Sequence, residues 1–220
     1  MAQWGNAEGE IKVRARQLPD DLETVCEDEY VARRSQPPPC PAKVADPGMC
    51  FGSSEHLLSS PPAPDSYGAS GFTNGCAVSA NNSEMWPVHC YGMVGVARNL
   101  SPDTGTGAEL YAVIGHAPRH LDRNIALIGR VVEGIEHLSS LPRGPGNGVY
   151  ADRSLRTPIL TVRLGNEVPG LPGYEYLSTE SAAFARYADA RANRRDPFFI
   201  VAAAGADICN IPVPVRRVKW

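Results

Sequence analysis

The sequence predicts a mainly β domain followed by a helical segment. Short apolar runs recur at regular intervals between residues 92 and 164, and glycine- and proline-rich turns separate them. The 220 residues include 21 glycines and 20 prolines, a composition that favours many turns and short strands over a helical bundle. Beyond residue 165, apolar residues at helical spacing replace this pattern, which indicates a change of structural class.

The apolar runs are expected to form buried strands of a sandwich or a closed barrel. They cover residues 92–97, 109–115, 125–132 and 157–164. An earlier stretch at 10–16, E-I-K-V-R-A-R, alternates strictly and predicts a strand with one apolar face. Ile135, Leu138 and Leu141 recur at helical spacing before Pro142, which indicates a short helix there.

Two further segments complete the expected organisation. Residues 35–66 are proline-rich, and because proline cannot donate to a strand ladder, this stretch is predicted to be a loop or an insertion. Ser178 or Thr179 is expected to cap a helix that runs to about Arg195, ahead of an extended tail. The division predicted is therefore a domain over 1–165 and a helical extension over 166–220.

Composition and charge narrow the classes of function. With 43% hydrophobic residues, 20% charged residues and a net charge of −3, the chain has the profile of a globular protein without a basic field for nucleic acid. It contains no apolar run of the ~20 residues that a membrane helix needs. The beginning of the chain has no signal-peptide pattern, so we expect a cytoplasmic protein with neither nucleic acid nor membrane as partner.

The cysteines and histidines do not predict a metal site or a cofactor. The 6 cysteines form no C-x-x-C pair or zinc spacing, so unpaired thiols without a chemical role are expected. His116 and His120 are four residues apart, but Pro118 lies between them and no acidic residue completes a helical metal motif. We therefore predict no metal and no cofactor.

The stretch from Gly92 to Ile135 resembles the cyclophilin family of peptidyl-prolyl cis-trans isomerases. The matching text is G-M-V-G-V-A-R, then P-D-T-G-T-G-A-E-L-Y-A-V-I-G, then H-L-D, and finally I-A-L-I-G-R-V-V-E-G-I. These blocks occur in the family's order with family-like spacing, which is more specific than any single block. The resemblance implies an antiparallel cyclophilin-like β-barrel with one or two helices, and a bacterial folding enzyme that acts on proline-containing peptides and unfolded protein clients.

The opening residues M-A-Q-W-G-N resemble another block of the family, written F-M-x-Q-G-G-D. In family members this block follows the first strands, a helix and the F-H-R segment that holds the catalytic arginine. The printed chain has no such segment before Met1, so the resemblance implies an incomplete barrel with weak activity. The extension is similar to that of larger proteobacterial members, whose full-length forms often carry export signals, so a periplasmic parent is the alternative to the cytoplasm.

The resemblance also assigns roles to individual residues. Tyr111 falls at the aromatic floor of the family's proline pocket, and Leu121 falls on its wall. Gln3 matches the glutamine that contacts the substrate backbone, and Arg98 is a conceivable candidate for a surrogate catalytic donor. The remaining predicted substrate-binding residues are Met1, Ala97, Glu109 and His120.

Two of these residues depart from the family's pattern. Glu109 replaces the usual glutamine and adds a charge beside the pocket, and His120 takes a position often held by tryptophan. Together with the missing arginine segment, they leave open a second interpretation, a non-catalytic module that binds proline peptides.

A third interpretation depends on the sequence D-T-G-T at Asp103. This motif is the signature of aspartic proteases, in which two aspartates share one proton, so a single copy requires a symmetric dimer. Ser101 and Pro102 precede Asp103 and favour a turn over the strand that a protease needs there. A dimeric aspartic protease is therefore a distant alternative.

Overall fold

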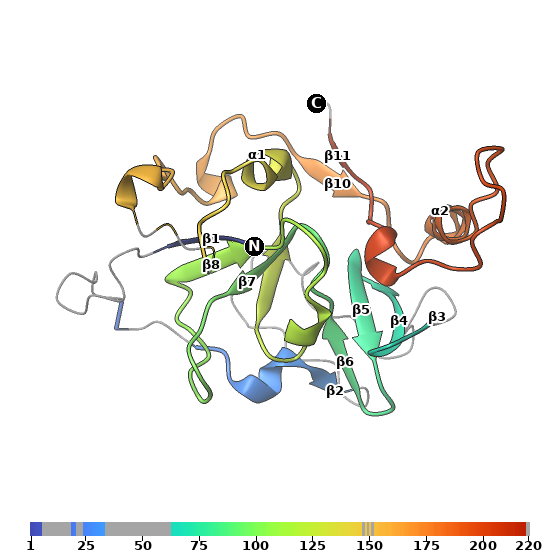
Figure 1. Cartoon of the computed structure of the whole chain (residues 1–220), viewed down its shortest axis with the longest axis horizontal. Helices are drawn as coiled ribbons and strands as arrows, with labels where there is room; N and C mark the ends of the chain where they lie inside the picture. Colours follow the sequence, from blue (N-terminus) through green and yellow to red (C-terminus); the bar gives the residue numbers. More distant parts are fainter. Residues whose placement is uncertain are drawn as a thin grey trace.

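A computed structural model describes residues 1–5, 19–20, 24–33, 63–146, 148, 150 and 152–218. Two antiparallel sheets lie side by side, a two-stranded sheet crosses above them, and helix α2 covers the outer side (Figure 1). The strand expected at 10–16 and most of the proline-rich stretch at 35–66 fall outside the described residues.

The first sheet contains the strands that the apolar runs predicted. Its order is β1-β8-β7-β9, and all its pairings are antiparallel. The bounds are Ala2–Gly5 for β1, Met93–Val96 for β7, Glu109–Ala112 for β8 and Leu127–Arg130 for β9. The runs at 92–97, 109–115 and 125–132 are thus confirmed as strands, each shorter than its apolar run.

The second sheet was not predicted from the sequence. Its order is β2-β6-β5-β4-β3, with bounds Ala32–Arg33 for β2, Ala63–Asp65 for β3, Gly68–Thr73 for β4, Cys76–Ala80 for β5 and Glu84–Pro87 for β6. Strands β4 and β5 form a hairpin around Asn74 and Gly75, whose φ angles are 47° and 74°. Asn-Gly is the residue pair that best tolerates two positive φ angles, so this turn carried a usable signal.

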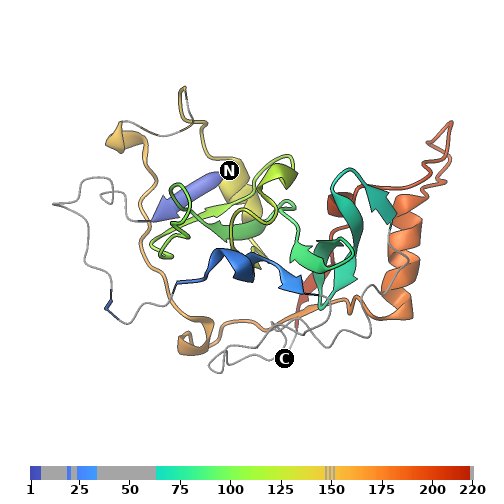
Figure 2. The same ribbon diagram turned by 90° about the horizontal axis from the view of Figure 1, so that it is seen from below.

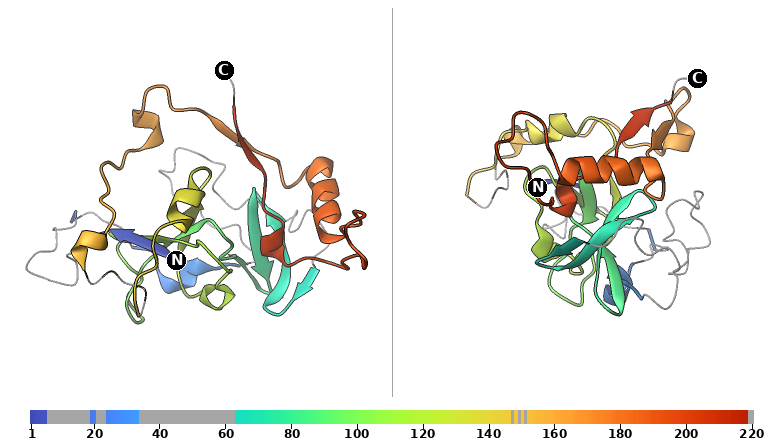
Figure 3. Two further views of the ribbon diagram at one scale, coloured as in Figure 1. Left: turned by 45° about the horizontal axis from the view of Figure 1, so that its top comes forward. Right: turned by 90° about the vertical axis from the view of Figure 1, so that its right-hand side faces the viewer.

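Helix α2 (Ala182–Ala192) lies beside the second sheet (Figures 2 and 3). Its buried side chains belong to one hydrophobic cluster with Phe72 of that sheet. Its Phe184 side chain is fully buried, and the ring lies 4.8 Å from that of Phe72 on β4, centroid to centroid. The helix was predicted, but its cap is Ser181, which accepts a hydrogen bond from the Phe184 N–H at 3.1 Å. Ser181 caps because it is the last extended residue before the helix; Thr179 lies buried and accepts from the Gly75 N–H instead.

The remaining elements connect these parts. A short helix α1 (Ile135–Ser139) follows β9 as expected, and β10 (Tyr174–Tyr176) pairs with β11 (Val215–Arg217). Glu133 accepts hydrogen bonds from Tyr174 and Arg217, so this small sheet is attached to the residues after β9. The 3-10 helices are η1 (Glu27–Tyr30), η3 (Arg119–Leu121), η4 (Arg153–Leu155), η5 (Gly165–Glu167) and η6 (Ile208–Asn210).

The strand expected at 157–164 is wrong. This segment is extended but pairs with no strand in the described part of the chain, and it follows the outside of the molecule (Figure 3). Leu160 and Val162 are 92% and 83% exposed. An apolar run indicates only a preference for burial; a strand also needs a neighbour to complete its hydrogen bonds, and none of the described strands lies alongside.

The described strands form open sheets and do not close into a barrel, which agrees with the expected incomplete barrel. Among the residues that the structure describes, no helix is both long enough and apolar enough to span a membrane. The predicted division at residue 165 stays a prediction, but residues of both parts share one hydrophobic cluster. Phe72 and Val88 contribute to it from the first part, and Phe184 and Ile208 contribute from the extension.

One expectation about the cysteines is also wrong. Cys90 and Cys209 form a disulfide, with Cα atoms 5.0 Å apart and a sequence separation of 119. Spacing rules could not find it because the partners approach only in the folded chain. In the described ranges, the free thiols are those of Cys26 and Cys76, and Cys40 and Cys50 lie outside these ranges.

Loss of the disulfide should destabilise the fold measurably. Replacing Cys90 by serine is expected to lower the free energy of unfolding by about 2–5 kcal/mol, because a long loop is no longer closed in the unfolded chain. Urea unfolding with Cys26→Ser as the control measures this difference. Peptide mapping without reductant should recover the Cys90 and Cys209 peptides as one linked species; separate peptides would contradict the pairing.

The buried face of α2 predicts a large effect of a single truncation. Phe184→Ala removes a fully buried ring and should lower the free energy of unfolding by about 3–5 kcal/mol. Phe198→Ala is the matched control, since that ring is 87% exposed and should change stability little. Equal effects of the two substitutions, measured by urea unfolding, would refute the packing described here.

Candidate functional site

A buried polar network connects the two large sheets, and the carboxylate of Asp122 lies at its centre. Asp122 follows η3 directly and is 6% exposed. Its Oδ1 accepts hydrogen bonds from the His89 backbone N–H at 3.0 Å and from His89 Nδ1 at 2.9 Å. Its Oδ2 accepts from Arg119 Nε at 2.7 Å, so three donors satisfy the buried charge.

One arm of the network reaches β8 through His89. This imidazole is fully buried, and its Nε2 lies 2.8 Å from the Tyr111 hydroxyl oxygen. A carboxylate only accepts, so His89 Nδ1 carries a proton toward Asp122. In the neutral imidazole Nε2 is then the acceptor for the Tyr111 O–H. Burial raises the pKa of Tyr111, with the Asp122 charge adding to the effect, so this hydroxyl stays protonated at neutral pH.

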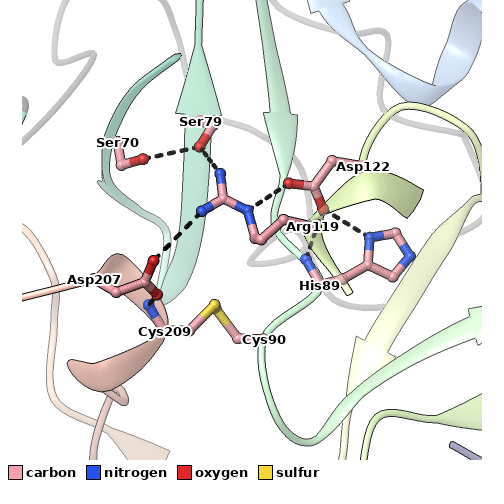
Figure 4. The surroundings of a disulfide bond; sticks show 8 residues. All are labelled: Ser70, Ser79, His89, Cys90, Arg119, Asp122, Asp207 and Cys209. Carbon is pink, nitrogen blue, oxygen red and sulfur yellow. Dashed lines mark hydrogen bonds and ion pairs between the residues drawn. A yellow bond between two sulfur atoms is a disulfide. The ribbon is translucent and has the colours of Figure 1, made fainter. Parts of the chain in front are cut away.

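The other arm reaches the second sheet and the extension through Arg119, as Figure 4 shows. Arg119 Nη2 donates to Ser79 Oγ at 2.8 Å, and Ser79 Oγ lies 2.9 Å from Ser70 Oγ on the neighbouring strand. Arg119 Nη1 lies 3.9 Å from Asp207 Oδ2. Asp207 in turn accepts from the Cys209 N–H at 2.8 Å, next to the disulfide, so the network ends at the extension.

The structure brings Gln3 and Glu109 together at one end of the first sheet. Strand β1 pairs with β8 so that Gln3 lies opposite Tyr111, and Gly5 lies opposite Glu109. The Gln3 side-chain amide donates to Glu109 Oε2 at 3.1 Å on the exposed surface. Glu109, two residues before Tyr111 on β8, thus accepts a hydrogen bond from the amide of the neighbouring strand.

Tyr111 and Leu121 are linked through the network rather than by a direct contact. Tyr111 is 3% exposed and packs with Met93 and Val113, while Leu121 is half-buried and immediately precedes Asp122. Two open hollows, of about 470 and 410 Å³, lie elsewhere, and neither is lined by these two residues. Their lining residues are Gly68, Ala69 and Ala80–Ser83 for the first and Glu175–Ser178 with Pro214–Arg216 for the second.

The other predicted residues lie in or next to the segments that flank the first sheet, and we call them, with Gln3 and Glu109, the rim. The Ala97 N–H donates to the Glu109 carbonyl at 2.9 Å, and Met1 is 64% exposed just before β1. His120 is exposed on η3, next to Leu121. Arg98 donates through Nε to the Asn124 carbonyl at 2.8 Å and through Nη1 to the Asn99 carbonyl at 2.7 Å, so its guanidinium serves to fix neighbouring loops.

Asp103 lies in a turn, and its carboxylate is engaged within that turn. It accepts from the Gly105 N–H at 2.7 Å and from the Asn99 side-chain amide at 2.9 Å. These hydrogen bonds, together with nearby Arg98, lower the pKa of Asp103. A proton-sharing aspartate of a protease requires the opposite arrangement, with a second carboxylate opposing ionisation.

Sequence reasoning missed His89, Arg119 and the serines that complete the network. Apart from Tyr111, only Asp122 of the network lies in a block that the family resemblance had singled out, the text H-L-D. Buried histidine and arginine side chains usually have partners, but the sequence does not say which ones. Among the described residues, no group of three or more His, Cys, Asp or Glu side chains could hold a metal ion.

The central carboxylate should dominate the energetics of the network. Asp122→Asn leaves the buried Arg119 guanidinium without its counter-charge and should lower the free energy of unfolding by about 3–5 kcal/mol. Asp196→Asn is the control, because its pair with Arg194 is exposed and is expected to contribute less than about 1 kcal/mol. Urea unfolding compares them, and a loss below about 1 kcal/mol for Asp122→Asn would contradict the central role.

Comparison with known proteins identifies the family. The model of the cyclophilin-type peptidyl-prolyl cis-trans isomerase family matches residues 51–163. A crystal structure of the cyclophilin AquaCyp293 from Hirschia baltica is similar in fold, with a TM-score of 0.60 and 20% sequence identity, over 98% of this chain and 71% of that one. A search of curated proteins found no match. Since the family model covers more than half of the residues, this chain belongs to the cyclophilin-type peptidyl-prolyl cis-trans isomerase family.

Proposed function

We propose that this chain binds proline-containing segments of peptides or unfolded proteins and accelerates rotation about the X-Pro bond weakly. The observation that carries the proposal is the placement of Gln3 opposite Tyr111 and beside Glu109, in a chain of this family. Tyr111 and Leu121 would hold the proline ring, and Gln3, Ala97, Met1 and His120 would line the peptide backbone.

The reaction needs no covalent step. The X-Pro bond rotates over a barrier of ~18–20 kcal/mol, which takes tens to hundreds of seconds without a catalyst. A site accelerates it by binding the twisted amide more tightly than the planar one. An apolar floor fixes the ring while a donor near the amide stabilises the nitrogen lone pair or the rotating carbonyl. Among the residues that we assign to the site, the Gln3 amide would supply this donor.

One observation favours a second candidate function, a module that binds proline peptides without catalysis. The Nε and Nη1 groups of Arg98 already donate to loop carbonyls, so the side chain would have to break these hydrogen bonds before donating to a prolyl nitrogen. A strong preorganised donor is what most separates a catalyst from a binder in this chemistry. We therefore expect binding to be easier to detect than acceleration.

The Cys90–Cys209 disulfide supports an oxidising compartment as the working environment. Disulfides persist in secreted and periplasmic proteins and are rare in the cytosol. Of the two compartments that the sequence left open, we therefore propose the periplasm.

The proposal predicts a specific loss on truncating the pocket wall. Leu121→Ala should weaken binding of a short proline peptide about tenfold, which corresponds to about 1.4 kcal/mol of lost contact. Leu160→Ala is the matched control, because that side chain is 92% exposed on the outer segment. NMR titration measures the affinity, and exchange spectroscopy on the same samples measures cis-trans exchange of the peptide.

These two measurements separate the candidate functions. Binding with faster exchange supports the isomerase, and binding with unchanged exchange supports the binding module. If the chain neither binds the peptide nor changes its exchange rate, both are wrong. Should Leu160→Ala and Leu121→Ala behave alike, the assigned site is wrong.

A further inference from the structure

The hydroxyl of Tyr111 distinguishes this residue from a purely apolar pocket floor. Its ring is almost completely buried, and its hydroxyl forms a 2.8 Å hydrogen bond with His89 Nε2. A buried phenol without a partner would be costly, so the ring is stable only where the hydroxyl reaches that nitrogen. The hydrogen bond thus selects one position of the ring along β8.

His89 itself cannot turn away from this bond. Its side chain and its own backbone N–H both donate to the same oxygen of Asp122, at 2.9 and 3.0 Å. The two donors fix the plane of the imidazole and place Nε2 toward β8. Because Asp122 is the residue after Leu121, the same chain of bonds holds the loop that carries Leu121 at a set distance from the Tyr111 ring.

Room for the hydroxyl comes from Gly95 on the neighbouring strand. Gly95 lies opposite Tyr111 in the β7–β8 register. A Cβ added at Gly95 would lie 2.4 Å from the Tyr111 hydroxyl oxygen and 2.5 Å from the ring carbon that bears it, both far shorter than van der Waals contact. The backbone of Gly95 does not have a positive φ, so an alanine would be excluded by the Tyr111 ring alone.

We infer that His89 and Gly95 are positioning residues for Tyr111, His89 by holding the hydroxyl and Gly95 by leaving it space. They act on peptide binding only through the place of the Tyr111 ring relative to Leu121. The expected effect on peptide binding rests on the proposed function, whereas the positioning of the ring does not. Any replacement that moves the ring should therefore change affinity without touching a residue of the rim.

The test compares Gly95→Ala with Gly129→Ala in the full chain. Gly129 lies on β9 of the same sheet, also without a positive φ, and a Cβ there would meet no atom within 4 Å. Gly95→Ala should weaken binding of a proline peptide about tenfold, and Gly129→Ala should leave it unchanged. In a Tyr111→Leu background, adding Gly95→Ala should cause no further loss, because sites that act through one residue are not additive.

A second readout does not depend on the ligand. The ¹⁵N resonance of His89 Nε2 should shift in Gly95→Ala and in Tyr111→Phe, since both remove its donor, and should stay in place in Gly129→Ala. Unshifted resonances in the first two variants would overturn the positioning inference. Additive losses of affinity in the Tyr111→Leu background would do so as well.

The two readouts distinguish the failure of each proposal. If the unaltered chain binds no proline peptide, the proposed function is wrong, and the ¹⁵N shifts still decide whether His89 and Gly95 position the ring. If the peptide binds but Gly95→Ala binds it as tightly as Gly129→Ala does, the positioning inference is wrong and the proposed function stands.

Discussion

Three parts of the molecule depend on one buried negative charge. The Asp122 carboxylate binds His89 on the segment between the sheets and Arg119 at the start of its own turn, and through them it reaches β8, β5 and the residues before Cys209. A charge in this position is unfavourable unless all its donors are present. The network thus joins the two sheets by polar contacts, beside Cys90, which packs against a hydrophobic cluster of each.

The same network explains why the candidate site is formed from separate regions of the sequence. Gln3 and Glu109 meet through the β1–β8 pairing, whereas Tyr111 and Leu121 are related through His89 and Asp122. Backbone hydrogen bonds between strands thus position Gln3 and Glu109, and side-chain hydrogen bonds position Tyr111 and Leu121, the floor of the candidate site. A substitution in the network would therefore disturb the Tyr111–Leu121 floor and lower the stability of the fold together.

The sequence predicted the parts of the fold that local pattern controls. The apolar runs at 92–97, 109–115 and 125–132 became strands, and the alanine-rich stretch near 182–192 became a helix, because burial and local periodicity agree there. The segment at 157–164 has the same pattern, but in the part of the chain that the structure describes no strand lies beside it to pair with. The assignment of site residues rests on the family resemblance and stays a prediction. The buried partner of Tyr111 depends on a contact 22 residues away in sequence, which no local pattern reports.

The position of the disulfide also affects how the chain is made. Cys90 leaves the ribosome 119 residues before Cys209, whereas the other four cysteines, Cys26, Cys40, Cys50 and Cys76, are synthesised before either of them. An oxidant that meets the nascent chain early finds only wrong partners for Cys90. Correct pairing therefore requires either late oxidation or an enzyme that reshuffles mispaired thiols, and the yield of native protein in a given host should depend on that supply.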